Sequence, residues 1–121
     1  MLIFDLPFPP SVNTYWRKFR NIMVLSQAAR DYKQAVAEYV IENKVPKLGD
    51  SKLEVTIWLY PPTKRSFDID NRIKAVLDSC QDAGIYEDDS QVDVLMVQRG
   101  KILKGGKATV MIEILQDTDK M

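Results

Sequence analysis

The sequence predicts a single α+β domain over residues 1–121, with the element order β-α-β-α-β-β and two helices packed on a mixed sheet. Its length of 121 residues is enough for one hydrophobic core and too short for two ordinary domains. Its composition, with 45% hydrophobic and 28% charged residues, is typical of a folded chain. Stretches of period-two alternation are interleaved with stretches of helical period, which favours a mixture of strands and helices.

The first half of the chain predicts two strands separated by a loop and a helix. Residues 2–8 alternate in polarity and meet a run of prolines, which indicates a short edge strand. Residues 9–21, PPSVNTYWRKFRN, are then predicted to form a long loop. Ser26 is a suitable N-cap for a helix that ends near Asn43, and residues 53–60 alternate again as a strand.

The second half predicts a helix followed by two strands. Asp68 occupies the N-cap position before an apolar stripe of helical period, and Gly84 is placed to end that helix. Residues 92–99 are β-branched and apolar enough for a central strand. Gly105-Gly106 marks a hairpin that leads into a last strand over residues 109–115.

Several classes of function are excluded by what the sequence lacks. The absence of histidine removes Ser-His-Asp hydrolysis, histidine-based nucleases and most zinc enzymes. Cys80 is the single cysteine, so an intrachain disulfide is impossible and a buried, inert thiol is expected. Neither a secretory signal nor a membrane-spanning stretch is recognisable, so we expect a soluble cytoplasmic protein, with residues 117–121 as a frayed tail.

The formal net charge of zero is the sum of separated patches. Residues 15–33 hold five cations and one acid, residues 99–107 hold four cations and no acid, and residues 75–98 hold six acids and no cation. This separation suits a metal-dependent enzyme that acts on a polyanion, whereas a set of solvated faces is the alternative. The first patch also contains Tyr15, Trp16 and Phe19, so it is suited to straddling a sugar-phosphate backbone or to forming a hydrophobic lid.

Acidic residues and a lysine converge on the second predicted helix. Asp68 and Asp70 stand at its start, Lys74 follows one turn later, and Asp88-Asp89 lie in the turn before the next strand. At about 100° per residue, Asp70, Lys74 and Asp78 line up along one edge of the apolar stripe.

This constellation permits two interpretations. Carboxylates from two segments are what Mg²⁺ requires, and such an ion produces hydroxide from water without histidine. Lys74 is then available to neutralise charge on a phosphate in the transition state. The alternative is an N-cap, a residue that favours the helix dipole, and an ordinary i,i+4 charge ladder. An EF-hand is excluded, because Ile73 stands where that loop needs glycine and Ser79 where it needs glutamate.

Spaced motifs resemble those of a known nuclease family. The run DIDNRIKAVLDSCQDAGIYEDDSQV, residues 68–92, and the segment PFPPSVNTYW, residues 7–16, resemble the RusA family of crossover-junction endodeoxyribonucleases. The double glycine is a third and weaker match. The resemblance implies that Asp68, Asp70 and Asp89 bind Mg²⁺, with Mn²⁺ as a substitute, and that Lys74 is essential for cleavage beside a neighbouring Asp88.

The resemblance also implies the substrate and the assembly. It indicates an intertwined homodimer, often of phage or prophage origin, that nicks two strands of a four-way DNA junction and leaves 5′-phosphate ends. The expected DNA-binding residues are Ser11, Asn13, Tyr15, Arg17, Lys64, Arg65 and Lys74. Before the D-x-D motif the arginine run of the family is thinned to Lys64-Arg65 and followed by Ser66-Phe67, which bears on DNA affinity. Phe67 is expected either as a wedge at the junction centre or in the core.

Two rival functions are compatible with the same residues. The first is a catalytically inactive module that binds branched DNA through residues 15–20 and 99–107. The second is a structural or assembly protein with an acidic surface. Retention of the aspartates and of Lys74 favours the enzyme over the inactive DNA-binding module.

Overall fold

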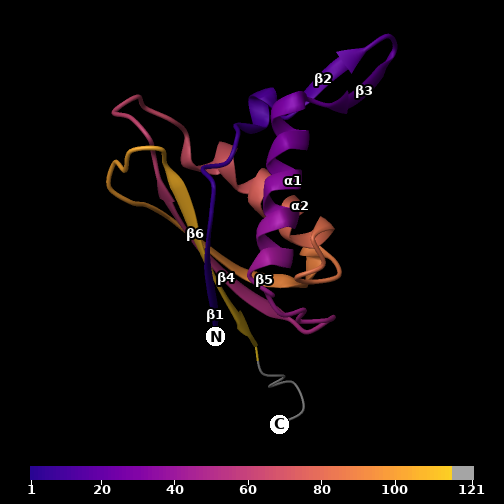
Figure 1. Ribbon diagram of the computed structural model, residues 1–121, viewed down its shortest axis with the longest axis vertical. Helices are drawn as coiled ribbons and strands as arrows, with labels where there is room; N and C mark the ends of the chain where they lie inside the picture. The colour runs from indigo at the N-terminus through magenta and orange to yellow at the C-terminus, as the bar shows by residue number, and fades with distance from the viewer. Residues whose placement is uncertain (116–121) are drawn as a thin grey trace.

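A computed structural model describes residues 1–115 as a four-stranded mixed sheet with two helices on one side of it, and with a small hairpin that projects from one end (Figure 1). The strands are β1 (Leu2–Leu6), β2 (Trp16–Phe19), β3 (Ile22–Leu25), β4 (Leu53–Tyr60), β5 (Val92–Arg99) and β6 (Lys107–Ile114). The helices are α1 (Gln27–Glu42) and α2 (Ile73–Asp82), with 3₁₀ turns η1 (Val12–Thr14), η2 (Ile69–Arg72) and η3 (Asp89–Gln91). The predicted α+β class and mixed sheet are confirmed.

The main sheet has the strand order β1-β6-β4-β5. β6 pairs antiparallel with β1 and β4, while β5 pairs parallel with β4. The parallel pair needs a crossover connection, and α2 supplies it. This connection runs α2 back along the sheet and brings the start of β5 close to the end of the helix (Figure 1).

The core lies between the sheet and the helices. Alternate residues of adjacent strands form buried rows across the sheet, of which Phe4, Val110 and Ile57 are one. Val36 of α1 and Val76 of α2, both 0% exposed, belong to the same core. The apolar residues that alternate along the strands and those that recur at helical spacing in the helices therefore pack together in one core.

The predicted start of the first helix and the predicted end of the second are confirmed. The Ser26 hydroxyl accepts a hydrogen bond from the Ala29 amide at 3.2 Å, which caps α1. Gly84 has a φ of 85° just beyond α2, and the Ile85 amide donates to the Cys80 carbonyl at 3.0 Å. Cys80 is a buried free thiol, as expected, and burial raises its pKa to about 12.

The start of the second helix differs from the prediction. Asp68 has an extended backbone and precedes η2, but its carboxylate accepts no capping hydrogen bond, and α2 begins only at Ile73. The first turn is therefore 3₁₀, which leaves the Asp68 side chain exposed rather than engaged with the helix.

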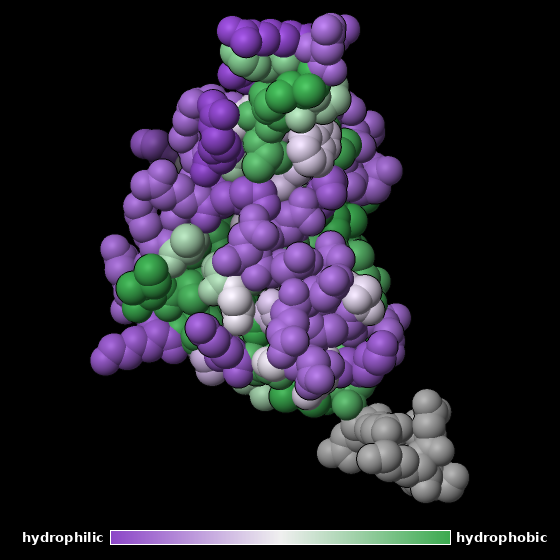
Figure 2. Space-filling model, turned by 90° about the vertical axis from the view of Figure 1, so that its right-hand side faces the viewer, coloured by the Kyte–Doolittle hydropathy of each residue, from purple (hydrophilic) through white to green (hydrophobic). Residues whose placement is uncertain are grey.

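The predicted loop over residues 9–21 is wrong in its second half. Residues 16–25 form a separate antiparallel hairpin of β2 and β3, which turns at Arg20 with a φ of 58°. Its large apolar side chains are exposed and gather at the top of the view in Figure 2. The turn contains no glycine, and the apolar residues of β3 are contiguous rather than alternating, so neither usual hairpin signal is present.

The prediction for the last two strands is corrected in two respects. β5 is an edge strand and not a central one. The double glycine does not close a hairpin, because β5 and β6 lie on opposite sides of β4. Their connection passes over the end of β4, where the Gly100 amide donates to the Leu59 carbonyl at 2.7 Å and the Leu103 amide to the Pro61 carbonyl at 2.9 Å. In residues 1–115 no helix is long and apolar enough to cross a membrane.

Candidate active site

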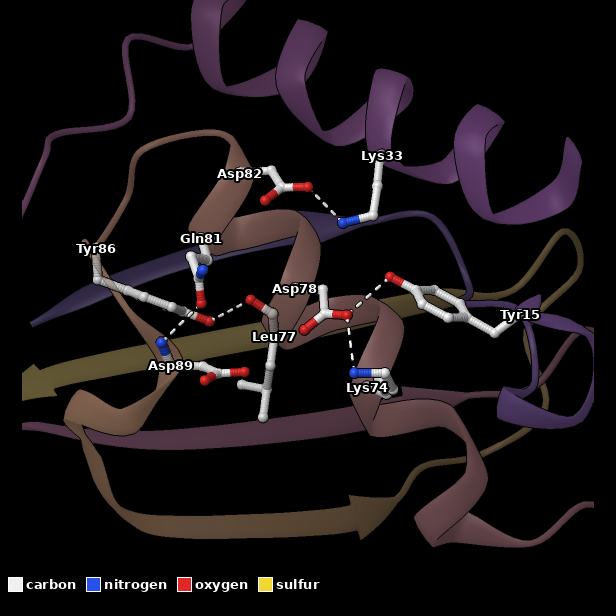
Figure 3. A network of polar contacts seen from close by, with 9 residues as sticks. All are labelled: Tyr15, Lys33, Lys74, Leu77, Asp78, Gln81, Asp82, Tyr86 and Asp89. Atoms are coloured by element: carbon white, nitrogen blue, oxygen red, sulfur yellow. Dashed lines mark hydrogen bonds and ion pairs between the residues drawn. The ribbon is translucent and has the colours of Figure 1, made fainter. Parts of the chain in front are cut away.

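Lys74 and Asp78 form an ion pair on the exposed side of α2. The Lys74 Nζ lies 3.1 Å from Asp78 Oδ2, and the Tyr15 hydroxyl donates to the same oxygen at 3.0 Å. Figure 3 shows the three side chains converging from α2 and from the segment before β2. Asp78 Oδ2 therefore contacts both Lys74, which the sequence predicted as a catalytic residue, and Tyr15, which directly precedes the β2–β3 hairpin.

Tyr15 anchors the hairpin to the site. Its side chain is 0% exposed, and its ring packs edge to face on the Trp16 ring with a centroid distance of 5.4 Å. Desolvation and the neighbouring Asp78 raise the pKa of Tyr15, so its hydroxyl stays protonated and donates. The Lys74 ammonium lies 5.8 Å from the Tyr15 ring centroid and 6.0 Å from that of Trp16, where cation–π attraction restrains it further.

Asp89 lies beside this ion pair at the far end of the α2 crossover (Figure 3). Its backbone amide donates to Gln81 Oε1 at 2.8 Å, which joins η3 to α2. Partial burial raises the pKa of Asp89, and the negative charges of Asp78 and Asp88 raise it further, while Lys74 opposes them. Asp89, Asp78 and Lys74 are thus electrostatically coupled.

Gln91 builds the turn that presents Asp89, and sequence reasoning missed it. Its side-chain oxygen accepts from the amides of Glu87 and Asp88, both at 2.8 Å. Its side-chain nitrogen donates to the carbonyls of Gly49 at 2.9 Å and Ser51 at 2.7 Å. An S/T/D-x-x-Q spacing, here Asp88 to Gln91, is the capping-box signal that would have identified it.

Asp88 acts as the cap of that turn. Its carboxylate accepts from the Ser90 amide at 2.8 Å, and this hydrogen bond lowers its pKa. The two adjacent aspartates are therefore held differently, with Asp88 fastened to the backbone and Asp89 directed toward α2 (Figure 3).

Asp70 lies in η2, and Asp68 is the residue directly before it. Both side chains are exposed. The Asn71 side chain donates to Asp68 Oδ2 at 3.4 Å. Within residues 1–115 no three acidic or cysteine side chains lie close enough together to hold one metal ion. Within a single chain, the charges of Asp78 and Lys74 act on Asp89. The binding of one metal ion by Asp68, Asp70 and Asp89 together stays a prediction.

A cleft of about 690 Å³ opens beside η2, and we call it the Arg72 cleft. One wall comes from the segment before β2 and the other from the segment between β4 and η2. Its lining residues are Phe8, Pro10, Ser11, Asn13, Thr14, Pro61, Pro62, Thr63, Arg65, Ser66, Phe67, Asp68, Asn71 and Arg72. Three of the predicted DNA contacts, Ser11, Asn13 and Arg65, therefore face one cavity.

The other predicted DNA contacts are distributed differently. Arg17 is exposed on β2, where its guanidinium lies 5.5 Å from the Phe19 ring centroid, and Lys64 is exposed before η2. Tyr15 is buried and presents no surface to a ligand. Phe67 is half-buried and packs on Phe8 with ring centroids 5.5 Å apart, so it belongs to the wall of the cleft.

The chain is similar to a set of nucleases along nearly all of its length. Residues 7–115 match the family model of endodeoxyribonuclease RusA. The chain is 35% identical over 113 residues to crossover junction endodeoxyribonuclease rusA of Enterobacteria phage HK97, covering 93% of this chain and 94% of that protein. It is 33% identical over 108 residues to the protein of that name from Escherichia coli strain K12, covering 88% and 89%. The similarity includes both the α2 site and the Arg72 cleft.

Proposed function

The chain belongs to the RusA family of endodeoxyribonucleases, and from this membership we propose that it is a structure-specific endonuclease that resolves four-way (Holliday) DNA junctions. The relatives from phage HK97 and from Escherichia coli K12 are both named crossover junction endodeoxyribonucleases. Within the chain, the observation that carries the proposal is the Lys74–Asp78 ion pair on α2, with the Asp89 side chain directed toward the same helix (Figure 3). A cation and carboxylates together suit hydrolysis of a phosphodiester in a chain without histidine.

Lys74 is the residue that would meet the phosphate. Its side chain is 42% exposed, so it can contact a ligand while its ammonium remains held. Asp78 and the aromatic rings of Tyr15 and Trp16 restrain the ammonium before the substrate arrives. Such preorganised positive charge stabilises the additional negative charge of the transition state without reorganisation during the reaction.

We propose Mg²⁺ as the cofactor, with Mn²⁺ as a substitute, and Asp68, Asp70 and Asp89 as its ligands, although these three carboxylates do not meet around one ion within residues 1–115. Their carboxylates have the hard oxygen chemistry that Mg²⁺ prefers, and this ion keeps several waters beside one or two protein ligands. The raised pKa of Asp89 supports the proposal, because a cation would offset the repulsion from Asp78 and Asp88. When bound, the ion lowers the pKa of a coordinated water and polarises a phosphoryl oxygen.

We further propose that the enzyme works as a homodimer on cytoplasmic DNA. Two symmetric sites suit two strands of a four-way junction, each nick leaving a ligatable 5′-phosphate end. β5 supports this part of the proposal, since it is an eight-residue edge strand with exposed Val94, Leu95 and Met96. An apolar edge of this kind is a template for pairing with another chain.

The test is cleavage of a synthetic four-way junction in the presence of Mg²⁺. We expect the wild type to produce paired nicks whose ends DNA ligase reseals, and Asp70→Asn and Lys74→Met to bind the junction but cut it far more slowly. Undiminished cutting by Asp70→Asn would remove the metal-ligand assignment. Binding without cutting by the wild type, in both Mg²⁺ and Mn²⁺, would leave a branched-DNA-binding module instead.

A further inference from the structure

Arg72 is held rigidly at the Arg72 cleft. Its Nη1 donates to the Pro9 carbonyl at 2.8 Å. Its guanidinium carbon lies 5.2 Å from the ring centroid of Phe8 and 5.8 Å from that of Phe67, and these two rings meet edge to face. A guanidinium that packs against two aromatic rings and donates to a backbone carbonyl has a defined position.

The positive charge of Arg72 has no counterion among residues 1–115. No carboxylate of residues 1–115 forms an ion pair with it, and its buried Nε has no hydrogen-bond acceptor there. A second cation adds to the local charge, because Arg99 lies 4.3 Å from the Phe67 ring centroid and donates to the Phe67 carbonyl at 3.0 Å. A half-buried and unpaired guanidinium is costly, and an anion in the cleft would offset that cost.

The neutral groups of the cleft are also suited to an anion. The Ser11 hydroxyl accepts from the Asn13 amide at 3.1 Å, and the Thr63 hydroxyl accepts from the Arg65 amide at 3.2 Å. Each hydroxyl therefore has its own hydrogen to donate. Hydroxyl and amide side chains together with arginine are the usual partners of DNA phosphates, and a cavity of about 690 Å³ is large enough for one nucleotide unit.

We infer that the Arg72 cleft binds a backbone phosphate of the DNA strand next to the phosphate that is cut, and that Arg72 is its main ligand. The inference rests on the proposed function, since it requires DNA as the substrate. Asp68 also lines the cleft, so the bound phosphate lies next to one of the predicted metal ligands. The site is a phosphate contact and therefore contributes affinity and position rather than sequence preference.

The experiment measures junction binding without divalent metal, from 50 to 200 mM salt, for the wild type, Arg72→Gln, Arg72→Lys and Lys47→Gln. We expect Arg72→Gln to bind roughly tenfold more weakly and to lower the slope of log K against log salt by about 0.9, the value for one lost phosphate contact. Arg72→Lys keeps the wild-type slope because it keeps the charge. Lys47→Gln changes neither quantity, since Lys47 is exposed between α1 and β4 and does not line the cleft.

A second variant keeps the test independent of the packing of Arg72. Asn13→Asp places a negative charge in the cleft from an exposed position, and we expect weaker binding with unchanged thermal unfolding. If the wild type binds the junction but Arg72→Gln or Asn13→Asp leaves affinity and slope unchanged, the cleft inference fails and the proposed function stands. If the wild type binds no DNA, both fail. A loss in Arg72→Gln that depends on the junction's base sequence would indicate a base contact and overturn the phosphate assignment.

Discussion

Asp78 has two partners at one oxygen, Lys74 at 3.1 Å and the Tyr15 hydroxyl at 3.0 Å. We predict that Asp78→Asn slows single-turnover junction cleavage roughly tenfold, about 1.4 kcal/mol in the barrier, with little change in junction affinity. The amide still accepts from Tyr15 but no longer attracts the ammonium, so Lys74 loses its position. The measurement is a quenched-flow cleavage assay with enzyme in excess.

Asp82 provides the matched control for Asp78. It lies one turn later on α2 and pairs with Lys33 of α1 instead (Figure 3). Asp82→Asn removes an equivalent charge from the same helix and is expected to keep the wild-type cleavage rate. Equal slowing by both substitutions would show that net charge on α2, rather than the position of Lys74, determines the rate.

The protonation of Asp89 is a second prediction at this scale. Its pKa is raised above the ordinary value of 3.8 by desolvation first and by Asp78 and Asp88 next. Asp78→Asn should lower the pKa of Asp89, and Lys74→Met should raise it, because they remove a repulsive and an attractive charge respectively. A carboxyl NMR titration measures both shifts. Movement of the two pKa values in the same direction would contradict the coupling.

The same shift has a defined sign in stability. Over the interval between the unfolded and the folded pKa of Asp89, the native protein binds more protons than the unfolded chain. The contribution of Asp89 to the free energy of unfolding is therefore present at low pH and falls as the pH rises through this interval. This cost is typical of residues that serve a ligand rather than the fold.

Some contacts between individual residues of the site could be predicted from the sequence. Helical spacing placed Lys74 and Asp78 on one edge of the helix, and their ion pair confirms it. The hydrogen bond from Tyr15 joins residues 63 positions apart, and no local pattern reports such a contact. Arg72 directly follows the run Asp68-Ile69-Asp70-Asn71, but its role depends on Phe8 and Phe67, which only the folded chain brings to it.

Among the elements, the connection from β5 to β6 permits a sharp test. A Cβ on Gly100 would lie 2.5 Å from two atoms of the Tyr60 ring. We predict that Gly100→Ala costs about 1–3 kcal/mol of stability through overpacking, which thermal unfolding measures. The double variant Gly100→Ala with Tyr60→Ala should lose less than the sum of the two single variants, because the clash is gone. Additive losses would mean that the ring is not the obstacle.

Element identity was predictable where burial imposes a period. α1, α2, β1, β4 and β6 have buried residues at regular intervals, and their periodicity predicted them. The β2–β3 hairpin was missed because it projects from the body and buries little, so no alternation is imposed on it. Its side chains instead contact each other, as where Arg17 and Arg20 lie 5.5 and 5.3 Å from the Phe19 ring centroid.

At the scale of the molecule, the position of β5 was the main error. The apolar residues of a strand indicate that something packs against it. They do not indicate whether that partner belongs to the same chain or to a second subunit. The exposed fractions of Leu95 and Met96, 41% and 49%, show that one copy leaves this edge open. This is the expected appearance of a strand that a second subunit completes, which is the dimer proposed above.

We predict that the wild type sediments as a dimer and that the double variant Leu95→Lys with Met96→Lys sediments as a monomer. Lysines on an edge strand block its pairing with another chain, because the charges would be desolvated at the interface. Ile41→Lys is the control, since Ile41 is 76% exposed on α1 and does not belong to the sheet. Analytical ultracentrifugation provides the measurement, and a variant that remains dimeric would assign the interface to another surface.

The central place of β6 has a consequence for biosynthesis. Among the strands of residues 1–115, β1 pairs only with β6, and the Thr109 hydroxyl donates to the Asp5 carboxylate across 104 positions of sequence. During synthesis, β1 therefore cannot pair in the sheet until β6, near the end of the described chain, has been translated. Chains that end before β6 lack the strand that joins β1 to β4. We expect such chains to remain unfolded and to be degraded by proteases.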